Sequence, residues 1–360
     1  MAISYDVWFE NGLNNMNYNI GVIGLGKIAS HFHIPAWTEI SNCTLHALCD
    51  SNQSTLELKG KEYSITNLYA DYQELLKDKS TDIININTPN KFHYQQTIDS
   101  LNTGKHVVIE KPFALNSGEA KEMVACARAN KVKLMCTHQS RFRPETKTIV
   151  DAINRNELGE IYYVKATNIA NRGVPEPSHY ILNSKNGGGP INDIGVHMLD
   201  LAWLFLGCPE PVSVYAIKHN TFSQTNEYVL NRSGDNIKET YDCEDLGIIQ
   251  IKFKKNKSLC LETSYLLNHP ENIVECKVYG TKGGITWPDN KIVKSNKGAI
   301  EISYLEKEKP YYASIKQLEH FVNCIEQNRK TIIPPEQSVT IIQMLEAIHL
   351  SAFGNNIIYL

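Results

Sequence analysis

The chain has 360 residues, of which 42% are hydrophobic and 21% charged; the length favours two globular domains, and the composition excludes a disordered or collagen-like chain. Its 36 Lys and Arg residues against 39 Asp and Glu residues give a net charge of -3, which leaves no broad basic surface for nucleic acid. The nine cysteines form no Cys-x-x-Cys pair, and neither a membrane-length apolar run nor a secretory signal pattern occurs, so we expect a soluble cytoplasmic protein with reduced thiols.

Residues 1–15 show neither a helical nor a strand period, and we expect them to form a tail without catalytic importance. From Tyr18 to about residue 137, short apolar strands alternate with helical segments, as parallel strands joined by helical crossovers require. The pattern therefore predicts an α/β fold with a doubly wound parallel sheet. We expect strands at 18–23, 44–49, 83–87, 106–109 and 133–137, and helices that run to Trp37 and over 54–63, 92–101 and 117–129.

After about residue 143 the pattern changes. A helix and a strand lead to a loop rich in Pro and Gly, and an apolar helix follows and stops at Gly207, a usual C-terminal signal. The next strands have no helices between them, which predicts a large, mostly antiparallel open sheet with one face solvated or used for association. We expect further helices at 145–156, 314–327 and 336–352, the loop at 171–190, and strands at 160–168, 212–218, 246–253, 258–265, 273–279 and on to about 304.

The segment from Gly24 to Ala29 reads Gly-x-Gly-x-x-Ala, follows the first strand directly and opens a helix. In such a turn the first Gly permits a tight bend, the second lets a pyrophosphate approach the backbone, and the small Ala lets the helix pack closely on the strand. Asp50 ends the second strand, where a carboxylate can accept hydrogen bonds from the adenosine ribose and would repel a 2'-phosphate. The pattern favours NAD over NADP, although Asp50 taken alone would more often be a turn residue or a helix cap.

Two segments carry candidate catalytic side chains, and the first is built around a lysine. Lys111 lies between Glu110 and Pro112 at the carboxyl end of an expected strand, the edge at which open α/β sheets bind ligands. Pro112 restricts the backbone of Lys111, and an X-Pro bond can be cis in a tight turn, which would hold the lysine side chain in the cleft. An ordinary surface lysine in a loop is the alternative.

The second segment places Asp193 and His197 four residues apart at the start of the apolar helix, directly after the glycine-rich segment 187–190. This spacing puts both side chains on one face, within reach of one bound hydroxyl group. Two interpretations stay open: a functional pair, or an N-cap at Asp193 with a buried, hydrogen-bonded His197. We expect no metal, because two ligands fall short of the three or four that a catalytic zinc requires.

Taken in order, these segments resemble the Gfo/Idh/MocA oxidoreductase family, which includes glucose-fructose oxidoreductase and inositol dehydrogenases, from about Met16 to the C-terminus. One position departs mildly, since Gln139 stands where many members have Asn. The motifs that carry the resemblance are Gly24-x-Gly26-x-x-Ala29, Thr88-Pro89-Asn90 with His93, Glu110-Lys111-Pro112, Arg141-Phe142-Arg143-Pro144, and Gly188-Gly189 followed by Asp193 and His197.

The resemblance implies an NAD(P)-binding Rossmann domain at 16–140 and a substrate-binding and oligomerisation domain at 141–360, whose last helix packs back toward the first domain. In this family the open sheet of the second domain commonly forms a homodimer or homotetramer. The family's catalytic groups correspond to Lys111, Asp193 and His197. The expected cofactor-binding residues are Gly24, Gly26, Lys27, Ile28, Ala29, Asp50, Thr88, Pro89, Asn90, His93, Glu110, Lys111 and Gln139.

The implied activity is hydride transfer between NAD and a secondary alcohol of a sugar or cyclic polyol. Because imidazole titrates near neutral pH, we expect His197 to exchange the hydroxyl proton, with Lys111 stabilising the alkoxide and Asp193 orienting His197 and binding a neighbouring hydroxyl. Three alternatives stay open: a redox-neutral sugar lyase or glycosidase, a ketoreductase of sugar biosynthesis, and a non-catalytic dinucleotide-sensing regulator. Further substrate contacts are expected in the loop before the catalytic helix, at Arg172, His179 and Tyr180.

Overall fold

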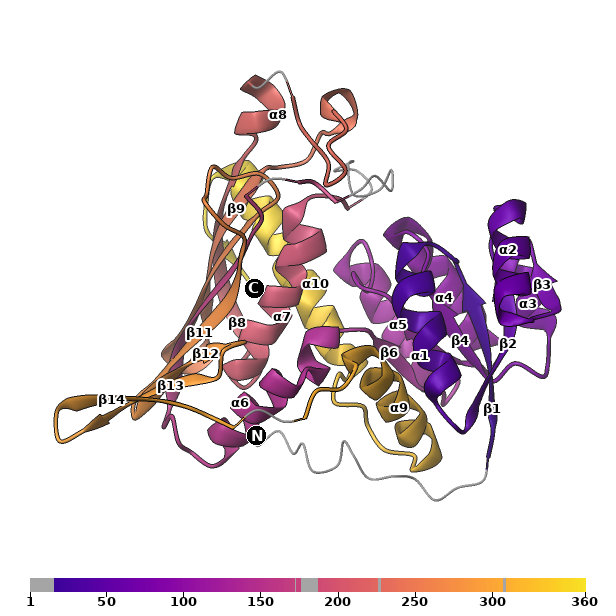
Figure 1. Cartoon of the computed structure of the whole chain (residues 1–360), viewed down its shortest axis with the longest axis horizontal. Coiled ribbons are helices and arrows are strands. Elements are labelled where there is room, and N and C mark those ends of the chain that lie inside the picture. Colours follow the sequence, from indigo (N-terminus) through magenta and orange to yellow (C-terminus); the bar gives the residue numbers. More distant parts are fainter. Residues whose placement is uncertain (1–15, 172, 176–186, 226–227, 307–308) are drawn as a thin grey trace. The chain divides into compact units, whose positions relative to one another are not determined.

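The computed structural model of the chain describes residues 16–171, 173–175, 187–225, 228–306 and 309–360, and Figure 1 labels its elements. The described residues form two compact units. We call residues 16–142 together with 312–342 the N-terminal unit, and the described residues of 143–311 together with 343–360 the C-terminal unit. The N-terminal unit thus takes up a segment, 312–342, that the sequence places in a second domain starting at residue 141.

The two parts of the N-terminal unit are joined around Arg141. Its buried guanidinium donates from Nη1 to the carbonyl oxygen of Ile332 (3.2 Å) and to Gln337 Oε1 (2.7 Å). The rings of Phe142 and His320 lie 5.6 Å apart, centroid to centroid. Since 191 residues separate Arg141 from Ile332, no local sequence pattern could have indicated this connection.

Six parallel strands form the sheet of the N-terminal unit, in the order β3-β2-β1-β4-β5-β6, which confirms the doubly wound parallel sheet. All four residues of β4 (Ile83–Ile86) are buried, as expected of a strand covered on both faces. The other strands are β1 (Tyr18–Ile23), β2 (Cys43–Cys49), β3 (Asn67–Tyr69), β5 (His106–Ile109) and β6 (Leu134–Cys136). The helical segments are η2 (Ala29–His33), α1 (Ile34–Glu39), α2 (Gln53–Tyr63), α3 (Tyr72–Lys77), η3 (Asn90–Phe92), α4 (His93–Asn102), α5 (Ser117–Ala129), η4 (Gln139–Phe142) and α9 (Ala313–Glu326).

This unit differs from the sequence-based expectation in two places. The strand β3 and the helix α3 lie where the sequence predicts neither, because three and six residues are too few to show a hydrophobic period. The helix after the glycine turn contains a five-residue π-helical segment, η2, ahead of α1. Such segments are rare and often lie at functional sites.

Nine strands form the sheet of the C-terminal unit, in the order β14-β13-β12-β11-β7-β10-β9-β8-β15, and of these neighbours β7 and β10 are parallel and the rest antiparallel. This confirms the large, mostly antiparallel sheet. The strands are β7 (Ile161–Ile169), β8 (Pro211–His219), β9 (Leu246–Phe253), β10 (Lys257–Ser264), β11 (Ile273–Gly280), β12 (Gly283–Trp287), β13 (Lys291–Asn296), β14 (Ala299–Tyr304) and β15 (Ile358–Tyr359).

The helical segments of this unit include three short ones that the sequence does not predict. They are α8 (Thr221–Thr225) and η7 (Lys238–Thr240), both between β8 and β9, and η8 (Lys254–Asn256), between β9 and β10. Helix α10 begins in the N-terminal unit and ends in the C-terminal unit. The segments are α6 (Pro144–Asn154), η6 (Ile191–Gly195), α7 (Val196–Phe205), α8 (Thr221–Thr225), η7 (Lys238–Thr240), η8 (Lys254–Asn256) and α10 (Pro335–Gly354).

The two faces of the nine-stranded sheet differ in what covers them. Helix α7 packs on one face of the sheet (Figure 1). By strand register that face carries the buried row Leu259, Val164 and Val278. The opposite face carries Tyr163 and Tyr279, whose partly exposed rings stack with centroids 5.4 Å apart. Since these side chains reach solvent, the sheet has one buried and one open face, as the alternating strands predict.

Candidate active site

The turn after β1 requires glycine at position 24. Gly24 has φ +87°, and its N–H donates to the carbonyl oxygen of Cys49 (2.8 Å). A Cβ atom on Gly24 would lie 2.9 Å from the backbone of Asn87 and Thr88, because β1 and β4 are neighbours in the sheet. At Gly26 a Cβ atom would meet nothing within 4 Å, so open space borders the backbone there. That space fits the close approach of a pyrophosphate.

Asp50 follows β2 directly, and two backbone N–H groups fix its carboxylate. Leu25 N–H donates to Oδ2 and Asn52 N–H donates to Oδ1, both at 2.8 Å. The N-cap of α2 is Asn52, whose side chain accepts from Thr55 N–H, so Asp50 is not the helix cap. Each carboxylate oxygen has a second acceptor site, and the half-buried Asp50 can still bind ribose hydroxyls.

The other residues expected at the cofactor differ in their exposure to solvent. The exposed ones are Lys27 and Ile28, the half-buried ones are Thr88, Pro89, Lys111 and Gln139, and the buried ones are Ala29, Asn90, His93 and Glu110. A side chain that is buried within the unit can affect a bound ligand by fixing the backbone around the site. Two of the buried polar residues, His93 and Glu110, hold such backbone segments in place.

His93 is fully buried and joins two turns at the carboxyl edge of the parallel sheet. Its Nδ1 lies 2.8 Å from the carbonyl oxygen of Pro112, and its Nε2 lies 2.8 Å from that of Thr88. Burial lowers the pKa of His93, and the two hydrogen bonds to carbonyl oxygens oppose this shift. His93 thus fixes the segment that follows Lys111, and its place at the cofactor stays a prediction.

Glu110 forms a buried hydrogen-bonded cluster directly before Lys111. Its Oε1 lies 2.7 Å from His33 Nε2 and accepts from Thr137 Oγ1 (2.7 Å), and its Oε2 accepts from Lys111 N–H (3.0 Å). Burial alone would raise the pKa of Glu110, but the hydrogen bond and charge of His33, with the charge of Lys111, lower it to about 2. His33, at the end of η2, was missed by the sequence analysis because no spacing rule connects it to Glu110.

Asp193 lies in the π-helical segment η6, and His197 lies in the first turn of α7. The N-cap of η6 is Pro190, with no side-chain cap, so Asp193 is not a capping residue. Nine of the ten residues of α7 are buried, and His197 is the exception. Both Asp193 and His197 are half-buried, so a capping Asp with a buried His does not describe this helix.

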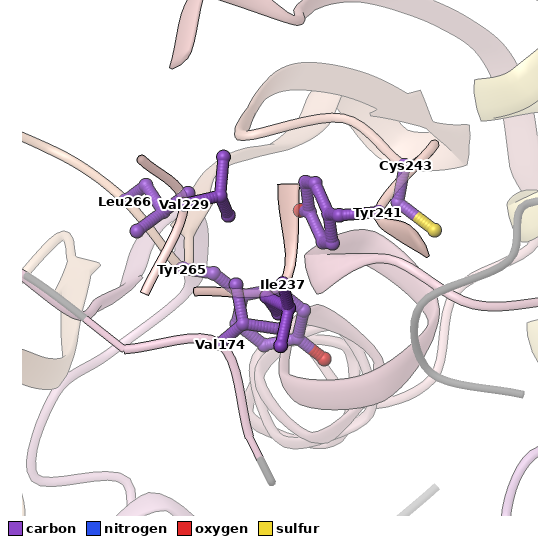
Figure 2. Close-up of a cluster of buried hydrophobic side chains, with 7 residues drawn as sticks. All are labelled: Val174, Val229, Ile237, Tyr241, Cys243, Tyr265 and Leu266. Carbon is purple, nitrogen blue, oxygen red and sulfur yellow. The ribbon is translucent and has the colours of Figure 1, made fainter. Parts of the chain in front are cut away.

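A buried tyrosine, Tyr265, holds Asp193. Its hydroxyl donates to Asp193 Oδ2 at 2.6 Å, although 72 residues separate the two. Tyr265 is the first residue after β10 and has no exposed surface. The sequence analysis missed it because no motif surrounds it. Its ring belongs to a cluster of buried side chains (Figure 2) made of Val174, Val229, Ile237, Tyr241, Cys243, Tyr265 and Leu266.

Glu244 anchors the glycine-rich loop in front of η6. Its buried Oε1 accepts from Ile191 N–H (3.3 Å), and Lys218 Nζ lies 3.5 Å from its Oε2. Gly189 has φ +98°, and a Cβ atom there would lie 2.6 Å from Glu244 Oε1. Glycine is therefore needed at this position, and Glu244 is the partner that the sequence motif did not reveal.

Lys111 belongs to the N-terminal unit, whereas Asp193 and His197 share one helix of the C-terminal unit. Within the described ranges, no three His, Cys, Asp or Glu side chains gather as ligands for a metal ion. No helix of the described part is long and apolar enough to cross a membrane. None of the nine cysteines forms a disulfide bond. The expected substrate contacts Arg172, His179 and Tyr180 lie outside the described residues.

Comparison with known proteins gives matches along almost the whole chain. A family model described as "Oxidoreductase family, NAD-binding Rossmann fold" matches residues 18–138, and one described as "Oxidoreductase family, C-terminal alpha/beta domain" matches residues 150–359. Among curated proteins, the D-glucoside 3-dehydrogenase of Escherichia coli (strain K12) is 29% identical over 344 residues, which cover 95% of this chain and 97% of that protein.

Two solved structures show the same fold. The aldose-aldose oxidoreductase from Caulobacter crescentus, complexed with glycerol, has a TM-score of 0.80 and 23% identity, and the match covers 96% of this chain and 100% of that one. A levoglucosan dehydrogenase in complex with NADH and levoglucosan has a TM-score of 0.80 and 18% identity, covering 96% and 99%. At these identities both structures bear on the fold alone.

Proposed function

The chain belongs to the Gfo/Idh/MocA oxidoreductase family, and on that premise we propose that it oxidises a secondary hydroxyl group of a sugar or cyclic polyol. The family match makes it an NAD-dependent dehydrogenase with an NAD-binding Rossmann fold. What we propose beyond this is the class of substrate and the role of each side chain in the reaction. The similarity to the D-glucoside 3-dehydrogenase puts glucosides first among the substrates to be tested.

One observation carries the residue assignment. His197 is the single residue of the apolar helix α7 that is not buried, and half-buried Asp193 stands one helical turn before it. A partly exposed imidazole on a helix that is otherwise buried can meet a ligand, whereas packing alone would be served as well by an apolar residue. This supports a role in proton transfer.

The proposed reaction divides the chemistry between the cofactor and three side chains. The turn from Gly24 to Ala29 and the carboxylate of Asp50 would hold NAD, which would supply the acceptor for the hydride that leaves the alcohol carbon. His197 takes the proton from the hydroxyl group as the C–O bond becomes a carbonyl, and Asp193 orients His197 and accepts a hydrogen bond from a neighbouring hydroxyl. Lys111 stabilises the negative charge that develops on the oxygen. In the direction of ketone reduction, His197 donates the proton.

We also propose that the open face of the nine-stranded sheet joins two or four copies of the chain. Tyr215, Tyr279, Ile302 and Tyr304 share that face by strand register and are 37–69% exposed. Apolar side chains gathered on one sheet face are typical of an association surface.

The direct test combines a substrate screen with two variants. Glucosides, free aldoses and inositols are supplied with NAD or NADP, and the absorbance of the reduced nicotinamide is followed. We expect Lys111→Ala and His197→Ala each to lower kcat at least ~100-fold while both variants still bind NAD, as measured by fluorescence titration. Lys121→Ala and His219→Ala, exposed residues of the same types, are the matched controls.

Near-normal turnover in both variants would remove the assignment of Lys111 and His197. A product that forms without net NADH would point instead to a redox-neutral reaction at the same site. Absence of any product from the whole panel, with NAD bound, would contradict the proposed substrate class.

A further inference from the structure

We propose that Tyr265 is a positioning residue that sets the orientation of the Asp193 carboxylate for catalysis. This inference rests on the proposed function, because it assumes that Asp193 acts in the reaction. The hydroxyl of Tyr265 donates to Asp193 Oδ2 at 2.6 Å, a distance typical of a hydrogen bond between a hydroxyl and a charged carboxylate.

The tyrosine is itself held rigidly. Tyr265 N–H donates to the carbonyl oxygen of Asp245 (3.2 Å), and the same oxygen accepts from Ser264 Oγ (2.7 Å). Ser264 Oγ in turn accepts from Leu266 N–H (3.0 Å). The ring is fully buried in the cluster shown in Figure 2. A hydroxyl on a buried, two-torsion side chain between fixed backbone groups has little freedom to move, so it can fix a charged partner.

The backbone around Asp193 does not depend on this contact. Asn168 Nδ2 donates to the Ile194 carbonyl oxygen (3.2 Å), and Thr263 Oγ1 donates to the Pro190 carbonyl oxygen (3.2 Å). Asp193 N–H itself donates to the carbonyl oxygen of Gly189, in the loop before η6 (3.0 Å). Loss of the Tyr265 hydroxyl should therefore leave η6 in place and remove this one hydrogen bond from the Asp193 carboxylate.

The chain offers a matched control inside the same cluster. Tyr241 is also buried there, but its hydroxyl donates to the backbone carbonyl oxygen of Glu244. Tyr265→Phe and Tyr241→Phe thus remove the same atom from the same cluster. Only Tyr265→Phe removes a hydrogen bond to the Asp193 carboxylate.

The test is a double-mutant cycle between Tyr265→Phe and Asp193→Asn, read in kcat and in urea unfolding. We expect Tyr265→Phe to lower kcat roughly 10- to 100-fold, the loss of a hydrogen bond to a charged group, with the KM for NAD unchanged. In the Asp193→Asn background the same substitution should change kcat less than about 2-fold, because a neutral amide has replaced the charged carboxylate that Tyr265 orients. Tyr241→Phe should change kcat less than about 2-fold in the wild-type background.

Three outcomes would overturn the inference. One is wild-type kcat in Tyr265→Phe, and another is an equal loss of kcat in both backgrounds, which would mark a structural role independent of Asp193. The third is coupling between the two substitutions in unfolding but not in kcat. If the wild-type chain turns over no substrate, the proposed function fails and the inference with it, while the unfolding cycle still reports whether the Tyr265–Asp193 contact exists.

Discussion

The two glycines of the cofactor turn should respond in opposite ways to the same substitution. In Gly24→Ala the new methyl group sits at φ +87° and 2.9 Å from backbone atoms of Asn87 and Thr88 that cannot swing aside. A left-handed backbone costs an L-residue about 1–2 kcal/mol, and overpacking adds about 1–3 kcal/mol. We therefore expect the free energy of unfolding to fall by about 2–5 kcal/mol.

In Gly26→Ala the methyl group meets no atom within 4 Å, so we expect the stability to change by less than about 1 kcal/mol. The same methyl group occupies the space that the pyrophosphate needs, and we expect the Kd for NAD to rise at least ~10-fold. Urea unfolding measures the first effect, and quenching of tryptophan fluorescence by NAD measures the second.

Equal urea midpoints for the two variants would contradict the first expectation, because the contacts at position 24 would then cost no stability. An unchanged Kd for NAD in Gly26→Ala would contradict the second. The pair controls itself, since both variants add one methyl group to the same turn.

Two further predictions concern a buried charge and the open sheet. The pKa of Glu110 falls from 4.5 to about 2 on folding, so its carboxylate stabilises the fold above about pH 4.5, and this contribution of about 3 kcal/mol is lost as the pH falls toward 2. Glu110→Gln should therefore be less stable than the wild type at neutral pH, with the gap closing in acid; a gap in urea midpoint that persists unchanged at low pH contradicts this. Ile302→Asp should dissociate an oligomer built on the open face without unfolding the monomer, as light scattering would show; an unchanged mass rules that interface out.

Much of the fold follows from the hydrophobic pattern. Strands such as β5 and β9 and the helix α5 were predicted to the residue, because the hydrophobic pattern of each is clearly bounded. β3 and α3 were missed because each is shorter than the window in which a period can be seen. The joining of Arg141 to Ile332 was out of reach for another reason, since it is a contact between distant parts of the chain.

The residues of the candidate site fall into the same two groups, those that a sequence pattern predicts and those that only the fold brings together. Residues in motifs, such as Gly24 and Asp193, were found because a spacing rule connects them to a chemistry. Tyr265 and His33 were not found, because each touches its partner through the fold alone, over 72 and 77 residues of chain. The residues that hold a catalytic group in place therefore emerge only with coordinates.

Both helices that carry the site contain a five-residue π-helical turn, η2 before α1 and η6 before α7. A π-helical turn holds one more residue than the α-helical turn that could replace it. Removing one residue there would let the helix continue as a regular α-helix, with its far end unmoved and the wider turn gone. The residues of the turn would then take other angular positions around the helix axis, and the contacts of His33 with Glu110 and of Asp193 with Tyr265 depend on those positions. The number of residues in each turn is therefore as much a part of the site as the side chains that it carries.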